Sequence, residues 1–224
     1  MPPYHSLNLA LNTGDNPSNV LKNRNIVCNN FSVLQSQMCL AKQIHGNDAI
    51  LINQKNKVAI ESTEADALIT KNKELLIGVL VADCYPLLIA DKSGMVIAAV
   101  HAGRKGIESG IIQQVLSVFK QKYHIKTSDL LVGVGPGISK TAYQVDKTTA
   151  EIFLKKTRYA NWDLTQNSVT LDLRAAIHKI LHDCDVDHRN IEDIELCTYA
   201  NPDMFFSYRY NNGLTGRFGA FIML

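Results

Sequence analysis

The sequence predicts one α/β (or α+β) domain over residues 1–224, with a mixed β-sheet flanked by helices. Three observations lead to this prediction. Short apolar runs bounded by turn residues indicate buried strands, and other segments carry apolar residues at helical spacing. Strands and helices are mixed without the strict alternation of a parallel sheet. With 224 residues and 46% hydrophobic content, the chain can bury one substantial core.

The first half of the chain contains most of the predicted strands. Residues up to about Asn25 are rich in asparagine and turn formers, with a short helix predicted at 16–27. Apolar runs then predict four strands, at 49–52, 75–81, 86–90 and 95–100. The turn Asp91-Lys92-Ser93-Gly94 joins the last two, so we expect a hairpin with Pro86 and Val100 at the same edge.

The second half alternates between helix and strand patterns. Apolar residues at helical spacing predict an amphipathic helix from about Arg104 to Tyr123. The remaining predicted elements are a strand at 130–134, helices at 147–156 and 173–184 (the latter with Asp172 as N-cap), and strands at 194–198, 205–208 and 217–223. A turn at Asn211-Asn212-Gly213 makes the C-terminus a predicted hairpin.

Composition excludes several partners and compartments. The net charge is only +2, which gives no electrostatic reason to expect nucleic acid or an anionic membrane surface as partner. The N-terminus has no signal-peptide pattern, and no apolar run approaches the roughly 20 residues of a membrane-spanning helix. The five cysteines include no CxxC pair, so we expect reduced thiols in the cytoplasm.

Three residues with metal-binding side chains lie next to glycine or an acid. His45 precedes Gly46, Cys84 follows Asp83 at the end of an apolar strand, and His101 ends the next strand but one. The predicted hairpin makes Cys84 and His101 neighbours. With His45 they would form the three-ligand set of a catalytic zinc, which keeps a fourth position open for water. The sequence does not by itself place His45 beside the other two, since a histidine before glycine is also a common turn residue.

Other candidate features have simpler interpretations. The glycine-rich run 133–137 lacks the third glycine of a dinucleotide loop, so we reject a Rossmann site. Asp66 is either catalytic or a turn cap, and the cap is the better expectation. Arg209 and Arg217 flank the predicted C-terminal hairpin as a solvated edge. The four histidines on or beside the later helices are expected at the surface; they are His124, His178, His182 and His188.

Several motifs together resemble one protein family. In chain order they are SLNLALNTGDNPSNVLKNR, KQIHG, ADALIT, ADCYPLLIAD, AAVHAGRKG, GVGPGIS followed by AYQV, and CTYANPDMFFSYRYNNGLTGR. The chain resembles the YfiH-type family, also called the laccase-domain, polyphenol oxidase or peptidoglycan editing factor family. The resemblance implies a single α/β domain with zinc bound by His45, Cys84 and His101.

The resemblance also implies an activity. Family members phosphorolyse inosine, adenosine and methylthioadenosine to the base and a pentose 1-phosphate, and deaminate adenosine. Zinc-activated water is the attacking group in other zinc deaminases. Copper-dependent phenol oxidation and an amidase-like editing of peptidoglycan precursors have been attributed to the family too. The partners implied are purine nucleosides and phosphate, and the chain is expected to be a monomer or homodimer.

Further site residues follow from the motifs. Arg104 and Lys105, at a predicted helix N-terminus after His101, are candidates for binding phosphate through charge and backbone N–H groups. Gln43 and Arg209 are further candidates for substrate or phosphate binding. Asp83 is a candidate proton-transfer group or support for Cys84, and structural support of the turn is an equal expectation.

The chain departs from the family pattern at two places. Family members usually carry His-Ala-Gly-Trp-Arg-Gly, whereas Arg104 stands here at the tryptophan position and Lys105 at the arginine position. Lysine offers a point charge in place of a bidentate fork. The family usually begins with a Thr-Arg…Gly-Gly strand before SLNL, so we expect this chain to be N-terminally short relative to the family, through either a misplaced start or a reduced anion site.

Two rival functions use the same residues. A cysteine hydrolase would use Cys84 as nucleophile and His101 as base on an amide substrate. A copper oxidase is expected to be incidental, because too few histidines cluster for a blue-copper or trinuclear centre. Metal content together with the reactivity of Cys84 discriminates between zinc chemistry and hydrolysis.

Overall fold

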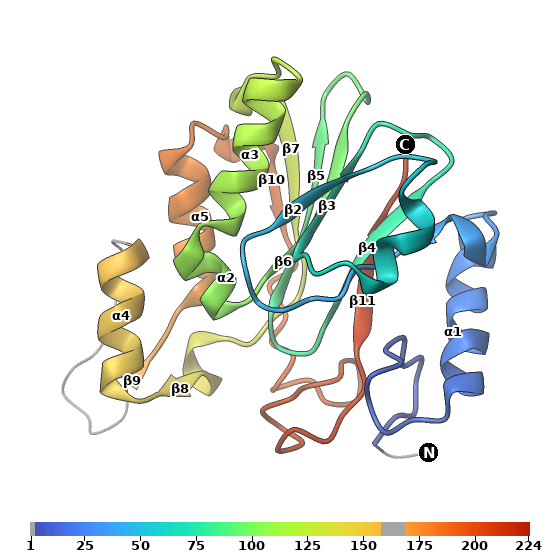
Figure 1. The fold of residues 1–224 in the computed structure, drawn as a ribbon. Coiled ribbons are helices and arrows are strands. Elements are labelled where there is room, and N and C mark those ends of the chain that lie inside the picture. Colours follow the sequence, from blue (N-terminus) through green and yellow to red (C-terminus); the bar gives the residue numbers. More distant parts are fainter. Residues whose placement is uncertain (1–2, 158–168) are drawn as a thin grey trace.

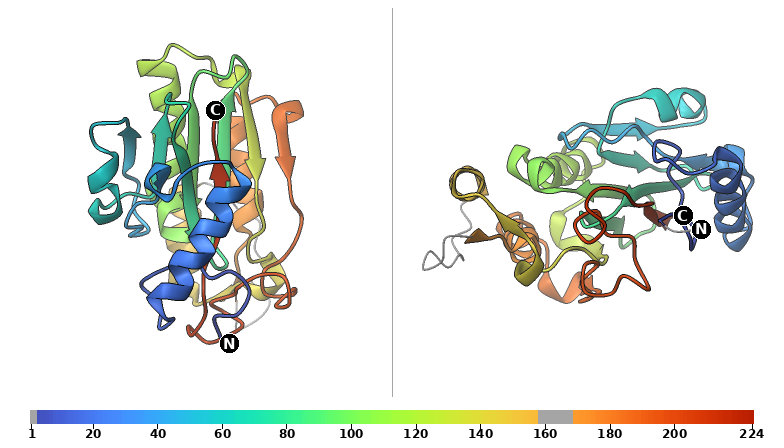
Figure 2. Two further views of the ribbon diagram at one scale, coloured as in Figure 1. Left: turned by 90° about the vertical axis from the view of Figure 1, so that its right-hand side faces the viewer. Right: turned by 90° about the horizontal axis from the view of Figure 1, so that it is seen from below.

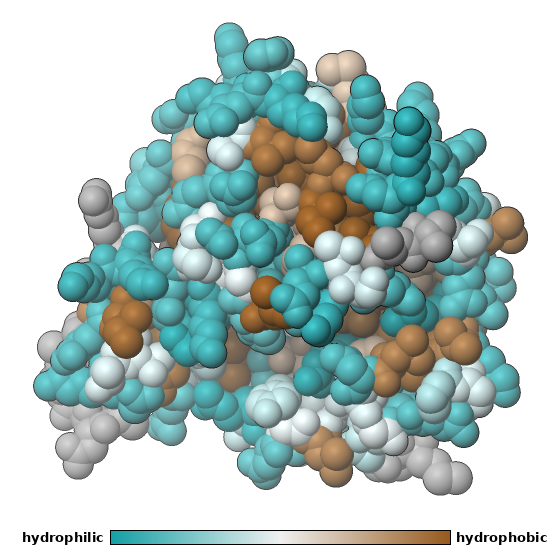
Figure 3. All heavy atoms as spheres, in the orientation of Figure 1, coloured by the Kyte–Doolittle hydropathy of each residue, from teal (hydrophilic) through white to brown (hydrophobic). Residues whose placement is uncertain are grey.

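The computed structural model describes residues 3–157 and 169–224. Its main chain is arranged in four layers (Figures 1 and 2): helices, a six-stranded sheet, a three-stranded sheet and one outer helix. This arrangement confirms the predicted mixed α/β class and the single domain. The face seen in Figure 1 is mainly hydrophilic, with apolar side chains in separate patches (Figure 3).

The six-stranded sheet forms the centre of the molecule. Its order is β10-β7-β5-β6-β3-β2, with antiparallel pairing in the middle and parallel pairing at both edges. The strands are β2 (Ala49–Ile52), β3 (Ala67–Thr70), β5 (Tyr85–Asp91), β6 (Ile97–Ala102), β7 (Leu130–Val134) and β10 (Ile191–Asp193). The second sheet contains β1 (Met38–Cys39), β4 (Leu76–Val81) and β11 (Phe218–Ile222), and β8 (Gln144–Val145) pairs with β9 (Val169–Thr170).

Helices cover the outer faces of the two sheets. They are α1 (Pro17–Asn30), α2 (Arg104–Ser109), α3 (Ile111–Lys122), α4 (Lys147–Thr157) and α5 (Leu173–Asp183). Short 3₁₀ turns lie in the connections: η1 (Gln35–Gln37), η3 (Thr127–Asp129) and η5 (His188–Asn190) between a helix and a strand, and η2 (Lys57–Ser62) and η4 (Lys140–Ala142) between two strands. The Asp172 side chain accepts a hydrogen bond from the Ala175 N–H, so the predicted N-cap of α5 is confirmed. Within the described residues, no helix is both long and apolar enough to cross a bilayer.

Strand alternation explains how one sheet can serve two cores. Along β6, Ala98 and Val100 face the helices, whereas Ile97 and Ala99 face the three-stranded sheet. Successive side chains of a strand point to opposite faces, so a run that is apolar throughout fits a strand covered on both sides. A third, smaller cluster lies between β4 and α1. The continuous apolar runs in the sequence therefore reflect burial between layers.

The predicted hairpin is confirmed, and its register positions the site. Strands β5 and β6 pair antiparallel, with Pro86 opposite His101 and Tyr85 opposite Ala102. Cys84 directly precedes β5, so it lies at the same edge as His101. Strand β4 ends at Val81 in the three-stranded sheet, and the turn through Asp83 and Cys84 carries the chain into the six-stranded sheet.

Two predicted helices differ from the structure, and one strand was not predicted. Helix 104–123 is divided at Gly110, whose φ of +86° ends α2 and begins α3. Strand β3 (Ala67–Thr70) was not predicted, because ADALIT was interpreted through its aspartate and the four-residue run is short. Helix α1 extends beyond the predicted segment, to Asn30.

The predicted C-terminal hairpin is wrong. Neither 194–198 nor 205–208 is a strand; residues 191–193 form β10 instead, and 218–222 form β11 against β4. The apolar side chains Ile194 and Leu196 are exposed, and the segment bonds to distant loops in place of a strand partner. Long-range hydrogen bonds outweigh the local strand pattern here.

Candidate metal centre and its cavity

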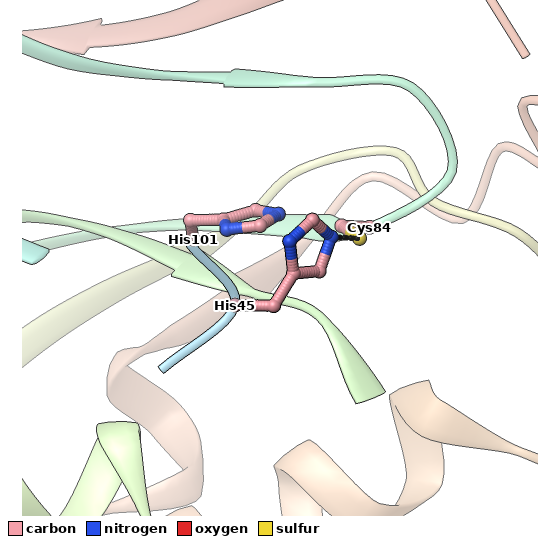
Figure 4. A group of neighbouring side chains, drawn as sticks. All are labelled: His45, Cys84 and His101. Atoms are coloured by element: carbon pink, nitrogen blue, oxygen red, sulfur yellow. Dashed lines mark hydrogen bonds between the residues drawn. The ribbon is translucent and has the colours of Figure 1, made fainter. Parts of the chain in front are cut away.

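Three segments bring His45, Cys84 and His101 together. His45 comes from the loop after β1, Cys84 from the β4–β5 turn and His101 from β6. Their ligand atoms all lie within 4.8 Å of one another, and the Cys84 sulfur is 3.7 Å from His45 Nε2 (Figure 4). Among the described residues, this is the group of three such side chains close enough to hold one metal ion.

One buried carboxylate orients both histidines. Asp66 accepts hydrogen bonds from the backbone N–H groups of Ile44, His45 and Gly46 at 3.2, 2.9 and 2.7 Å. The same carboxylate lies 2.7 Å from Nδ1 of His101, which leaves Nε2 for a ligand. His45 has φ +60°, and successive N–H groups around one anion form a nest that holds this conformation. The expected turn cap at Asp66 is therefore confirmed, and the contact with His101 is an additional role.

The space around the three ligands admits no side chain at position 103. A Cβ on Gly103 would lie 2.9 Å from Cδ2 of His45 and 3.0 Å from the Cys84 sulfur. The glycine in HAGRKG is thus required by close approach to the ligands.

Charge and burial oppose each other at Cys84 and His101. Burial by itself would raise the pKa of the Cys84 thiol, but the charge of His101 and hydrogen bonds from His101 and His45 lower it to about 6. Burial would lower the pKa of His101, yet the Cys84 thiolate and Asp66 raise it to about 9. Without a metal, the neutral-pH pair is therefore thiolate and imidazolium.

The donor set fits a metal ion of the zinc type. One thiolate and two imidazoles within mutual reach, with one imidazole fixed by a carboxylate, form three legs of a tetrahedral site. His101 is 3% exposed and Cys84 half-buried, while His45 is exposed. All three side chains line the adjoining cavity, so a fourth ligand would reach a bound ion from there.

The cavity beside the three candidate ligands has a volume of about 720 Å³. It is lined by the ligands, by residues 10–12 and 40–43, by the β4–β5 turn, and by Tyr143, Tyr208, Arg24, Glu61, Arg209 and Arg217 among others. A volume of this size is in the range of small-molecule sites.

The predicted site residues are distributed unevenly around this cavity. Gln43 lines it, but its amide donates to Leu80 O at 2.7 Å and accepts from Leu80 N at 2.8 Å, which ties the His45 loop to β4. Arg209 also lines the cavity. Arg104 is paired with Glu108 and Lys105 is exposed, and neither belongs to the cavity lining.

Asp83 is engaged as support for the turn. It is 8% exposed, and its carboxylate accepts from Thr198 Oγ1 at 2.6 Å and from the Arg209 N–H at 2.7 Å. Its carbonyl accepts from the Ile138 N–H at 2.8 Å. Its φ of +90° is unusual for a residue with a side chain, so these bonds hold a strained position beside Cys84.

Sequence reasoning missed three residues of the cavity. Arg217, expected at a solvated hairpin edge, lies in the cavity wall, and Arg24 and Tyr143 line the cavity although no motif assigns them a role. Arg24 lies on α1 and donates to Leu9 O at 2.9 Å. An arginine in an otherwise polar helix gives no sequence signal of burial. The place of Arg217 in the cavity wall is incompatible with the predicted C-terminal hairpin, so the sequence pattern indicated a different position for it.

The fold and the site define a single-domain α/β protein with a histidine–cysteine–histidine centre able to bind a metal ion. The chain belongs to the family described as multi-copper polyphenol oxidoreductase laccase, whose model matches residues 1–224. The resemblance to the YfiH-type family is thereby confirmed.

Named relatives and solved structures agree with this assignment. The chain is 33% identical over 217 residues to a purine nucleoside phosphorylase of Corynebacterium glutamicum, covering 96% of this chain and 85% of that protein. It is 31% identical over 228 residues to purine nucleoside phosphorylase YfiH of Shigella flexneri, covering 100% and 88%. The crystal structure of YlmD from Geobacillus stearothermophilus matches with a TM-score of 0.93 at 28% identity, covering 100% of this chain and 86% of that one.

Proposed function

We propose that this protein is a zinc-dependent purine nucleoside phosphorylase that acts on inosine, adenosine and methylthioadenosine and also deaminates adenosine. The observation that carries the proposal is the metal-competent centre opening into a nucleoside-sized cavity. The names of the relatives support the phosphorylase class. The reduced cysteines expected from the sequence suit a cytoplasmic location, and all five are free thiols.

Phosphorolysis requires that phosphate be bound next to the sugar and that the purine base leave. An oxygen of hydrogenphosphate bonds to C1′ of the nucleoside, the C1′–N9 bond breaks, and its electron pair leaves with the base. The proton of hydrogenphosphate ends on the base, so the products are a pentose 1-phosphate dianion and a neutral purine. Positively charged side chains in the cavity wall stabilise the phosphate and hold it at the sugar.

His45, Cys84 and His101 would hold the zinc ion. When bound, such an ion supplies Lewis-acid polarisation of a substrate oxygen or of water. Asp66 orients the His101 imidazole and holds the backbone of His45, and the buried position of His101 excludes water from one side of the centre. Copper also binds imidazole and thiolate, but among the described residues a single three-ligand group is present, which disfavours multi-copper oxidation.

Deamination of adenosine would use the same cavity. Water adds its oxygen to C6, the C6–N6 bond breaks, and the amino group leaves as ammonia after taking up a proton. The products are inosine and ammonia. A purine C6 placed near the three ligands is the geometry that zinc deaminases use.

A pair of assays on the zinc-reconstituted protein tests the proposal. Zinc content should approach one per chain, and inosine should release hypoxanthine only when phosphate is present. Adenosine should yield inosine and ammonia in phosphate-free buffer. Absence of phosphate-dependent base release from all three nucleosides by zinc-loaded protein would refute the phosphorylase assignment.

One observation favours a second candidate, a cysteine hydrolase. The site contains the arrangement of a nucleophilic triad: Cys84 supplies a thiolate, His101 an imidazolium beside it, and Asp66 the carboxylate that orients His101. In that case the sulfur would attack an amide carbonyl and His101 would give its proton to the leaving amine. Metal-free protein that hydrolyses amides and loses this activity on alkylation of Cys84 would favour hydrolysis; inactivity of the metal-free protein favours the phosphorylase.

A further inference from the structure

The positive charges in the cavity wall fall into two kinds. Arg24 is paired with Glu61, and Lys42 with Glu64 at 2.7 Å. Across the described part of the chain, neither Arg209 nor Arg217 has a carboxylate within 4 Å of its guanidinium. These two guanidinium groups are therefore available to bind an anion that enters the cavity.

Arg217 is held in place without being neutralised. Its Nη1 donates to the carbonyls of Thr215 and Gly216 at 3.0 and 2.8 Å, and its guanidinium lies 5.6 Å from the centre of the Tyr208 ring. The side chain is half-buried, and burial lowers its pKa, while the charges of Cys84, Tyr208 and Asp83 oppose that shift without cancelling it. A half-buried guanidinium of this kind is stabilised when an anion binds.

Arg209 is anchored in the same manner on the neighbouring wall. Its Nη1 donates to Gln144 O at 3.0 Å and to Ala142 O at 3.4 Å, and its guanidinium lies 5.2 Å from the centre of the Tyr143 ring. Across the described residues, no hydrogen bond uses Nε or Nη2 of either arginine. Each guanidinium therefore keeps donors for a tetrahedral oxyanion, which it can bind in bidentate fashion.

Both arginines lie beside the metal-competent centre. The backbone N–H of Arg209 donates to Asp83, which directly precedes Cys84, at 2.7 Å. Arg217 lines the same cavity as the three ligands. Arg104 and Lys105, the candidates from sequence, are neutralised and exposed, respectively.

We propose that Arg209 and Arg217 form the subsite for a tetrahedral phosphate group next to the metal-binding centre. This inference rests on the proposed function, which requires that a phosphate enter as inorganic phosphate and leave on a pentose 1-phosphate. The same two guanidinium groups would hold it in both forms.

Binding to the zinc-loaded protein tests the subsite. Inorganic phosphate and ribose 1-phosphate are titrated calorimetrically, in separate arms, against the wild type, R209M and R217M. Loss of charge-assisted hydrogen bonds should weaken binding of both by about 10- to 100-fold for each variant. R189M is the matched control, because Arg189 pairs with Asp187 and is not part of the cavity lining. R217K keeps the charge without the fork and should lose less affinity than R217M.

The outcomes separate the subsite from the function. Circular dichroism and zinc content establish which variants are folded and loaded, and R209M and R217K allow the test to proceed if R217M does not fold. Wild-type affinity in folded R209M and R217M would overturn the subsite. If both variants lose phosphate binding while the wild type releases no base from inosine, the subsite stands and the phosphorylase assignment fails. If the wild type is a phosphorylase and both variants bind phosphate normally, only the subsite fails.

Discussion

Asp66 is the residue on which two of the three metal-ligand positions depend. Asp66→Asn keeps the shape but replaces one acceptor oxygen with an NH₂ group, which must face either His101 Nδ1 or a backbone N–H of the His45 nest. We expect zinc affinity to fall by about 10- to 100-fold, the usual effect of removing such a partner. Competition with a chromophoric chelator measures the affinity.

Two further readouts distinguish orientation from general destabilisation in this variant. Imidazole ¹⁵N shifts of the metal-free protein should report a changed protonation state at His101, because Asp66 helps to raise its pKa, and the spectrum of the cobalt form should change. Asp203→Asn, at an exposed aspartate, is the control and should leave all three measurements unaltered. Unchanged zinc affinity in folded D66N would show that Asp66 does not orient the zinc ligands.

The pH dependence of Cys84 follows from the direction of its pKa shift. Because its pKa is lowered to about 6, the thiolate predominates above pH 6 in metal-free protein, whereas an ordinary thiol ionises near pH 8.5. Alkylation by iodoacetamide, followed by mass spectrometry from pH 5 to 9, should therefore rise with a midpoint near 6. Cys39, buried and with its pKa raised to about 11, is an internal control that should stay unmodified. A midpoint above pH 8 at Cys84 would contradict the thiolate–imidazolium pair.

At the scale of elements, the break between α2 and α3 depends on one glycine. Gly110 has φ +86°, a conformation that costs a residue with a Cβ about 1–2 kcal/mol. Gly110→Ala should lower the free energy of unfolding by that amount and Tm by about 2–8 °C, measured by calorimetry. Gly133→Ala is the comparison, because its Cβ would meet only Leu88 O, at 3.9 Å, and its φ lies outside the left-handed region. Equal losses in both variants would show that the turn is not the cause.

The elements that could be predicted are those whose signals are local. The β5–β6 hairpin followed from two apolar runs and a four-residue turn, and with it the proximity of Cys84 and His101. The Asp172 cap was likewise local. Strand β11 lies where it was predicted, but its pairing was wrong, because its partner β4 lies more than a hundred residues earlier and no local pattern around Arg217 indicates that pairing. The position of His45 depended on Asp66, whose role exists only in three dimensions.

At the scale of the whole molecule, the candidate metal centre joins segments of both sheets. His45 and Cys84 follow strands of the three-stranded sheet, whereas His101 lies in the six-stranded one. Zinc at about 100 times its dissociation constant should therefore stabilise the fold by about 2.7 kcal/mol, which corresponds to about 5–10 °C in Tm. Calorimetry with zinc and with chelator measures this difference.

The ligand dependence of that stabilisation is testable with one variant. Cys84→Ser removes the thiolate with little change in volume, so its Tm should be the same in zinc and in chelator. A zinc effect that persists in C84S would mean that the ion binds elsewhere. The cavity walls could not be predicted from sequence for the same long-range reason: residues 10–12 and Arg217 meet only in the folded chain.

The hydrogen bonds that join residues 8–9 to Arg217 have a consequence for synthesis on the ribosome. All three candidate ligands have been translated by residue 101, but the Arg217 N–H donates to Asn8 at 2.9 Å and the Leu9 N–H to the Arg217 carbonyl at 3.0 Å. The cavity wall that contains Arg209 and Arg217 therefore closes only after Arg217 has left the exit tunnel. A nascent chain can present its thiol and imidazoles to the solvent for the time that the ribosome needs to add the residues between His101 and Arg217.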